Sequence, residues 1–144
     1  MRERARSTPQ PPEKKSRDVQ LAENRRATYD YVIEERLEAG VALTGTEIKS
    51  LRAGHVNLRD GFVKIDGGEA WLRGVHISPW ERAGYVSHEP LRQRKLLLHK
   101  SEIDFLARAS AQRGYTVVPL RMYTKQGRAK VELALGRGKR RYEK

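Results

Sequence analysis

The chain has 144 residues, with 30 Lys and Arg against 18 Asp and Glu, which gives a formal net charge of +12 and a pI near 10.3. This length fits one domain with tails, and no apolar run reaches the ~18 residues of a membrane span. Residues 1–17 are charged and lack the apolar segment of a secretory signal peptide. Cysteine is absent, which excludes disulfides and thiolate metal sites. We therefore expect a cytoplasmic protein whose charge is neutralised by nucleic acid rather than by a membrane.

Residues 1–23 are expected to form a disordered basic arm. Three prolines lie between Ser7 and Pro12, and Val19 and Leu21 are the only large apolar side chains after the initiating residue. The folded body is expected over 24–136. A second basic tail is expected over 137–144.

The body is expected to consist mainly of strands. Apolar residues alternate over 28–36 and again over 37–43, where Gly40 suggests a bend or bulge. Two hairpins follow from their turns, Asp66–Gly68 and Thr124–Arg128. In the last strand, 129–135, alternate residues point to opposite faces, with Lys130 on the solvated one.

Two helices are expected between the strands. Thr44 is an expected N-cap, and Glu47 completes a capping box three residues later. A second helix is expected to start at Ser101, paired with Asp104, and to stop at Gly114. Six or so short strands with two or three small helices favour a mainly β fold, a closed antiparallel barrel of the OB-fold type.

Catalysis and metal binding have little support in the sequence. The four histidines lack the spacing of metal ligands. The segment Gly136–Lys139 resembles a phosphate loop but lacks the strand–loop–helix context. Glu34, Glu35 and Glu38 are interpreted as surface acids in salt bridges rather than as general acids or bases. We expect no enzymatic activity, no cofactor, no metal and no small-molecule substrate.

Basic residues come in clusters from separate segments, and we expect them to converge on one surface that contacts RNA phosphates. Trp71 is expected in the core, whereas Trp80 and Tyr85 fit either the core or stacking on bases. The clusters are Lys49 with Arg52; Arg92, Arg94 and Lys95; and Lys125, Arg128 and Lys130.

Several ordered strings resemble one family. They are Asn24–Ala27, Glu38–Gly40, Gly45–Gly54, Arg94–His99, Gly114–Leu120, Gly127–Val131 and Gly138–Lys144. Over residues 24–144 the chain resembles the SsrA-binding proteins (small protein B, SmpB). The resemblance implies an OB-like barrel that binds the tRNA-like domain of transfer-messenger RNA (tmRNA). It also implies delivery of that RNA to the decoding region of the small subunit in stalled ribosomes, for trans-translation.

The resemblance also implies site residues, of which Asn24, Glu38, Lys49, Leu97 and Lys130 match the family's RNA-contacting or activity-sensitive positions. Lys130 suits a phosphate. Glu38 either accepts hydrogen bonds from RNA or orders nearby arginines, and Leu97 is either core or exposed against RNA. Asn24 either contacts RNA or caps the start of the fold. The full expected RNA-binding set is Asn24, Arg25, Glu38, Lys49, Arg52, Arg94, Lys95, Leu97, Lys125, Arg128 and Lys130. Lys139, Arg140, Arg141 and Lys144 are expected to contact the ribosome.

One departure concerns the C-terminus. Members of this family carry a longer basic tail, and this chain stops at Lys144, where that tail would begin. If the tail is shortened, RNA binding should survive while tagging of stalled chains fails.

Two alternatives remain beside the leading interpretation: an OB-fold ribosomal protein that binds ribosomal RNA, and a small RNA hydrolase that uses Glu38 or His99.

Overall fold

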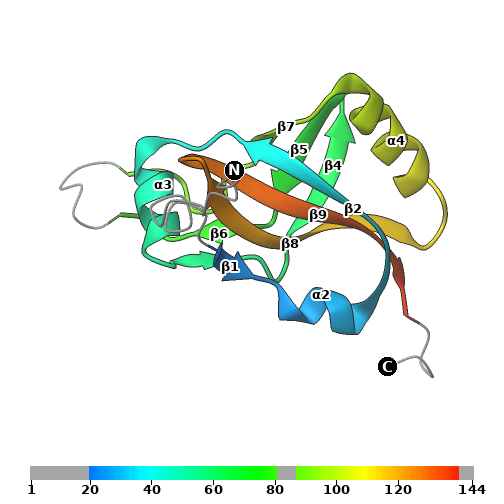
Figure 1. Ribbon diagram of the computed structural model, residues 1–144, viewed down its shortest axis with the longest axis horizontal. Coiled ribbons are helices and arrows are strands. Elements are labelled where there is room, and N and C mark those ends of the chain that lie inside the picture. The colour runs from blue at the N-terminus through cyan, green and yellow to red at the C-terminus, as the bar shows by residue number, and fades with distance from the viewer. Residues whose placement is uncertain (1–19, 81–86, 140–144) are drawn as a thin grey trace, which may run out of the picture.

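The computed structural model describes residues 20–80 and 87–139 (Figure 1). The helices are α2 (Arg25–Asp30), α3 (Gly45–Arg52) and α4 (Lys100–Ser110). The strands are β1 (Gln20–Glu23), β2 (Tyr31–Val41), β3 (Val56–Asn57), β4 (Phe62–Asp66), β5 (Glu69–Arg73), β6 (His76–Ile77), β7 (Arg94–Leu97), β8 (Tyr115–Lys125) and β9 (Arg128–Gly138).

The strands form one large sheet and one small one. The large sheet has seven strands in the order β1-β8-β9-β2-β7-β5-β4, and β3 pairs with β6 in the second sheet. Every pair is antiparallel. The prediction of a mainly β, antiparallel fold is confirmed.

The expected closed barrel is not found in the described part of the chain. The sheet ends at β1 on one side and at β4 on the other, and no ladder joins these two strands. The sheet curls until β4 lies close to β8, and α4 packs against both strands. Side chains of this helix, Leu106 and Ile103 among them, join the core at this seam, so apolar packing takes the place of ladder hydrogen bonds.

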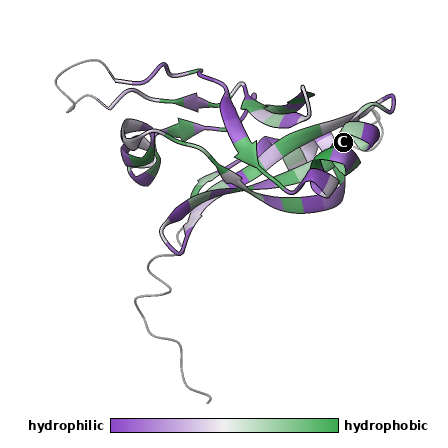
Figure 2. Cartoon of the chain, turned by 90° about the horizontal axis from the view of Figure 1, so that it is seen from above, coloured by the Kyte–Doolittle hydropathy of each residue, from purple (hydrophilic) through white to green (hydrophobic). Residues whose placement is uncertain are grey.

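Apolar side chains are buried on both sides of the long strands. The main core lies inside the curl and includes Leu72, Leu96, Met122 and Leu133. A smaller cluster lies on the opposite face, where Ala27 of α2 covers parts of β8 and β9. Figure 2 shows hydrophilic and hydrophobic residues alternating along parts of the long strands, where only one face is packed.

Helix α2 was not expected. The predicted strand over 28–36 begins only at Tyr31, because Thr28 to Asp30 belong to this helix. Its N-cap is Asn24, whose side chain accepts a hydrogen bond from the Ala27 amide at 3.2 Å. Six residues are too few to show a helical period, and Tyr29 and Tyr31 mimic strand alternation.

The ends of the body also differ from expectation. Residues 20–23, placed in the disordered arm, form strand β1 on the edge of the sheet. Strand β9 continues to Gly138, two residues into the expected tail. Residues 1–19 of the arm lie outside the described residues.

The predicted hairpins and the first predicted helix are confirmed. Thr44 and Glu47 form the capping box of α3. Gln126 and Gly127 both have positive φ, 53° and 79°, as a two-residue hairpin turn requires. Helix α4 starts at Lys100 rather than Ser101, and Glu102 instead of Asp104 accepts from the His99 amide, at 2.9 Å.

Candidate nucleic-acid interface

Four neighbouring strands place one residue each in a single row on the outer face of the sheet. Tyr123 of β8 is opposite Lys130 of β9, Lys130 is opposite Gly40 of β2, and Gly40 is opposite Leu97 of β7. Opposed residues of antiparallel strands share a face. The neighbours on the opposite face are core residues: Met122, Val131, Ala39 and Leu96. We call Tyr123, Lys130, Gly40 and Leu97 the outer row.

A groove of about 810 Å³ runs beside the outer row. Leu97 lies in it with 56% of its surface exposed, together with the charged side chains of Lys95 and Lys130. Of the two alternatives for Leu97, the structure shows the exposed one, whereas Leu96 is core. The lining of the groove includes Glu38, Gly40, Gly68, Glu69, Lys95, Leu97, Leu98, His99, Lys100 and Lys130.

Gly40 explains how Leu97 reaches this position. Of the bend or bulge expected at Gly40, the bulge is wrong, because β2 is in register there with both neighbours and its register shift lies between Ile33 and Glu35. A Cβ on Gly40 would lie 3.3 Å from both Cβ and Cδ1 of Leu97. The glycine therefore forms the floor on which the leucine side chain rests.

Glu38 supplies a negative group to the groove. Tyr123 Oη donates to Glu38 Oε2 at 2.5 Å, and Lys125 Nζ lies 3.5 Å from the same oxygen. The Tyr123 hydrogen bond is the main reason that the pKa of Glu38 is lowered, with Lys125 and Lys130 adding to it against the effect of burial. Burial and the bond to Glu38 raise the pKa of the Tyr123 phenol. Glu38 is thus an ionised hydrogen-bond acceptor at neutral pH.

The expected basic residues differ in how free they are. Within residues 20–80 and 87–139, four of them have no ion-pair partner: Lys49, Arg52, Arg128 and Lys130. Three others form solvent-exposed pairs, which contribute little to stability. They are Arg25 with Glu23 at 3.5 Å, Lys95 with Glu69 at 2.9 Å and Lys125 with Glu38 at 3.5 Å.

Arg94 is a core residue, and its predicted role as an RNA contact is wrong. Its side chain is 0% exposed, and its Nε donates to Glu47 Oε2 at 2.8 Å. Nη1 donates to the Val75 carbonyl at 2.9 Å. Neighbouring residues on a strand point to opposite faces. A cluster of basic residues in the sequence therefore does not show which of them points into the core.

Glu47 binds two arginines, the buried Arg94 and the partly exposed Arg92, in a network that sequence reasoning missed. Arg92 Nη2 donates to Glu47 Oε1 at 2.6 Å, beside the Arg94 contact. Burial alone would raise the pKa of Glu47, but bonds from Arg92, the Thr44 amide and Arg94 lower it to about 2. The capping box located Glu47, yet nothing in the sequence connects it with residues 45 and 47 positions away.

Asn24 acts as a cap, one of the two alternatives left open for it. It is 6% exposed, and its amide donates to the carbonyls of Leu58 at 3.2 Å and Pro119 at 3.0 Å. Because its carbonyl oxygen caps α2, the whole side chain is engaged inside the protein.

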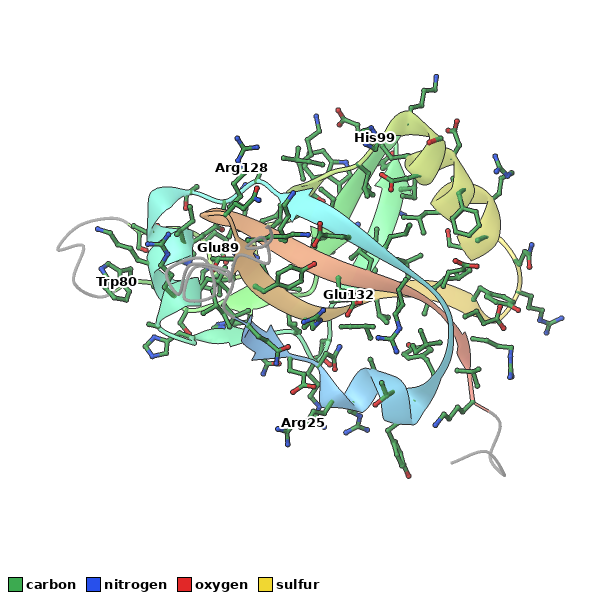
Figure 3. All side chains as sticks on the ribbon, viewed as in Figure 1. Arg25, Trp80, Glu89, His99, Arg128 and Glu132 are labelled. Carbon is green, nitrogen blue, oxygen red and sulfur yellow. The ribbon has the colours of Figure 1, made fainter. Side chains whose placement is uncertain are left out.

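Other expected residues lie away from the groove. Lys49 and Arg52 are on α3, and Arg25 is on α2, which lies on the opposite side of the ribbon from Arg128 and His99 (Figure 3). Lys139 is half-buried, and its amide donates to the Asp30 carbonyl at 3.0 Å. Arg140, Arg141 and Lys144 lie outside the described residues. The basic residues therefore do not all converge on one face.

The aromatic residues give a mixed result. Trp71 is half-buried on the outer face of β5, opposite Lys64 and Lys95, while its neighbours Ala70 and Leu72 enter the core. Its expected place in the core is wrong. Trp80 is half-buried, and Tyr85 lies outside the described residues.

The described residues contain neither a metal-binding cluster nor a membrane-spanning helix. Among residues 20–80 and 87–139 no three side chains of the metal-binding types come together to hold an ion. No helix in this part of the chain is long and apolar enough to cross a membrane.

The fold and the groove define the class: a small, strongly basic, mainly β protein whose curled sheet carries a mixed basic, acidic and apolar groove on its outer face. The family model described as "SmpB protein" matches residues 21–144. The chain belongs to the SmpB family, which confirms the resemblance seen in the sequence.

Individual relatives agree with this assignment. The SsrA-binding protein of Roseiflexus castenholzii is 59% identical over 125 residues, covering 86% of this chain and 79% of that protein. The SsrA-binding protein of Lactiplantibacillus plantarum is 54% identical over 127 residues, covering 88% and 81%. A solved structure described as "tmRNA-SmpB: a journey to the center of the bacterial ribosome" contains a chain that is 47% identical, with a TM-score of 0.72 and coverage of 89% and 88%.

Proposed function

We propose that this chain binds the tRNA-like domain of tmRNA and delivers it to stalled ribosomes, at the decoding region of the small subunit, for trans-translation. The match to the SmpB family over residues 21–144 carries this proposal. The relatives named above are SsrA-binding proteins, and the similar solved chain belongs to a tmRNA–SmpB structure in the bacterial ribosome. These names favour tmRNA over ribosomal RNA as the primary ligand.

The groove beside the outer row supports the same function on physical grounds. Lys130 offers a cation for a phosphate, and Glu38 offers an acceptor for a base edge or a ribose hydroxyl. Leu97 adds an apolar surface that packs against an unstacked base or a sugar. Folded RNA presents all three kinds of group close together, whereas a plain basic patch would need only phosphates.

The proposal extends to the kind of protein and its location. We regard the curled sheet as an OB-like, partly open barrel, because β4 approaches β8 without pairing to it. We regard the chain as a cytoplasmic binding protein rather than an enzyme. Incubation with end-labelled tmRNA should leave the RNA intact, and cleavage that the Glu38→Gln variant abolishes would establish the hydrolase instead.

The test compares equilibrium binding of the tRNA-like domain with that of a ribosomal RNA fragment of equal length. Leu97→Ala is compared with Leu91→Ala, because these leucines are 56% and 58% exposed and only Leu97 lines the groove. We expect tighter binding of the tRNA-like domain and a several-fold loss for Leu97→Ala, about 1 kcal/mol for one buried apolar contact. Equal affinity for both RNAs, or equal losses for both leucines, would contradict the proposal.

A further inference from the structure

Tyr123 and Glu38 meet across a strand that lies between them. Tyr123 belongs to β8 and Glu38 to β2, and β9 separates the two strands in the sheet. The phenol nevertheless reaches over β9 and donates to Glu38 Oε2 at 2.5 Å. The two residues are not in-register neighbours. So short a contact therefore requires that the Tyr123 side chain be held in one orientation.

The next row of the same face holds the Tyr123 ring in place. The guanidinium carbon of Arg121 lies 4.9 Å from the centre of the ring, a cation–π contact. Arg121 is fixed in turn, because its Nε donates to Glu132 Oε1 at 2.9 Å. Glu132 is in register with both Arg121 and Glu38, so this row runs beside the outer row across three of its four strands, β8, β9 and β2.

The arrangement leaves one oxygen of Glu38 available. Tyr123 and Lys125 both contact Oε2, and Oε1 has no hydrogen-bond partner among the residues that the structure describes. The side chain is 38% exposed and lines the groove. Without the phenol, the remaining contact would be Lys125 at 3.5 Å, too long to fix a flexible carboxylate.

We propose that Tyr123 is a positioning residue of the groove, whose hydroxyl fixes the Glu38 carboxylate so that its other oxygen accepts a hydrogen bond from the bound RNA. This inference rests on the proposed function. Tyr123 acts through Glu38, and its ring need not touch the RNA. The pKa of Glu38 supports the geometry, because the bond from Tyr123 is the largest cause of its lowering.

The chain contains a matched control pair on the same two strands. Tyr115 Oη donates to Glu34 Oε2 at 3.1 Å, again from β8 to β2, and neither residue lines the groove. Tyr115→Phe therefore removes the same chemical group from the same kind of contact at a place where no RNA is expected.

The experiment measures the affinity for the tRNA-like domain of the parent, Tyr123→Phe, Glu38→Gln, their combination and Tyr115→Phe. We expect Tyr123→Phe to weaken binding about tenfold, as removal of one bond to a charged group does. The combined variant should bind no more weakly than Glu38→Gln, since the phenol acts through that carboxylate. Tyr115→Phe should bind like the parent.

A second readout separates positioning from folding. Carbon-13 NMR titration of the free protein should show a higher pKa for the Glu38 carboxyl in Tyr123→Phe and an unchanged one in Tyr115→Phe. A loss of affinity without this pKa change would assign Tyr123 to the fold and overturn the inference, as would additive losses in the combined variant. If Tyr123→Phe binds the RNA as tightly as the parent, the inference about Tyr123 is overturned and the proposed function stands. If the parent itself does not bind, the proposed function is overturned as well.

Discussion

Leu97 of β7 rests directly on Gly40 of β2, where a single added carbon would lie 3.3 Å from the leucine Cβ and Cδ1. The absence of a side chain at position 40 keeps Leu97 close to the sheet, in the groove that Lys130 also lines, with 56% of its surface still exposed. An exposed leucine at this place contributes little to folding, because its apolar surface remains in water. Gly40 thus fixes the position of the leucine that we propose as an RNA contact.

Gly40→Ala should move Leu97 and weaken RNA binding. A Cβ at 3.3 Å from two atoms of Leu97 is tighter than ordinary packing, so the leucine must shift by a few tenths of an ångström. We expect a several-fold loss of affinity for the tRNA-like domain with a small change in unfolding free energy, about 1 kcal/mol or less. Gly45→Ala is the control, because nothing lies within 4 Å of its added carbon. Unchanged affinity for Gly40→Ala would show that the position of Leu97 does not matter.

Glu47→Gln should destabilise the fold strongly, although it changes only one atom of the side chain. The carboxylate is 0% exposed and neutralises Arg94, which is also 0% exposed. Removal of one partner of such a buried pair costs about 3–5 kcal/mol. Urea unfolding measures this cost. Glu69→Gln is the control, since its pair with Lys95 is 45% exposed on both sides and should cost less than about 1 kcal/mol. Equal costs would contradict the buried network.

The same carboxylate makes stability depend on pH in the acid range. The pKa of Glu47 is about 2 in the folded chain against an ordinary 4.5, so its contribution is fully present above pH 4.5 and is lost as the pH falls towards 2. The difference corresponds to roughly 3 kcal/mol. Unfolding free energies measured between pH 6 and pH 2 should therefore fall more steeply for the parent than for Glu47→Gln. Parallel curves would show that Glu47 titrates normally in the folded chain.

Asn24→Asp should destabilise the fold even though aspartate is a good N-cap. The substitution keeps an oxygen for the Ala27 amide but removes both bonds to the Leu58 and Pro119 carbonyls and places a charge beside them. We expect a loss of about 2 kcal/mol, measured by thermal unfolding. Thr44→Ser, which keeps the N-cap oxygen of α3, should stay within about 0.5 kcal/mol of the parent. Neutral behaviour of Asn24→Asp would mean that capping is its main role.

Local signals predicted local structure well. The capping box at Thr44 and Glu47 and the glycine-containing hairpin turns depend on residues close in sequence, and each is present. Helix α2 escaped prediction although its cap is local, because its six residues are too few to show a helical period. The open edge of the sheet depends on distant contacts, since α4 packs at the seam between β4 and β8, which do not pair.

The candidate site was predictable in part for the same reason. Lys130 follows from strand alternation, and Leu97 came from the resemblance to the family. The floor at Gly40 and the bond from Tyr123 to Glu38 require the strand order β8-β9-β2-β7, which no local pattern contains. The prediction that Arg94 contacts RNA was wrong, because a cluster of basic residues in the sequence does not show which of them faces the core.

The central claim is that RNA binds along the outer row, and the salt dependence of affinity tests it most directly. Binding of the tRNA-like domain is measured across a salt series for the parent, Lys130→Ala and Lys64→Ala. Lys64 is exposed on β4 and does not line the groove. Each lost phosphate contact lowers the slope of log K against log salt by about one. The account predicts that lower slope for Lys130→Ala and the parental slope for Lys64→Ala. A parental slope for Lys130→Ala would contradict it and place the RNA on another face.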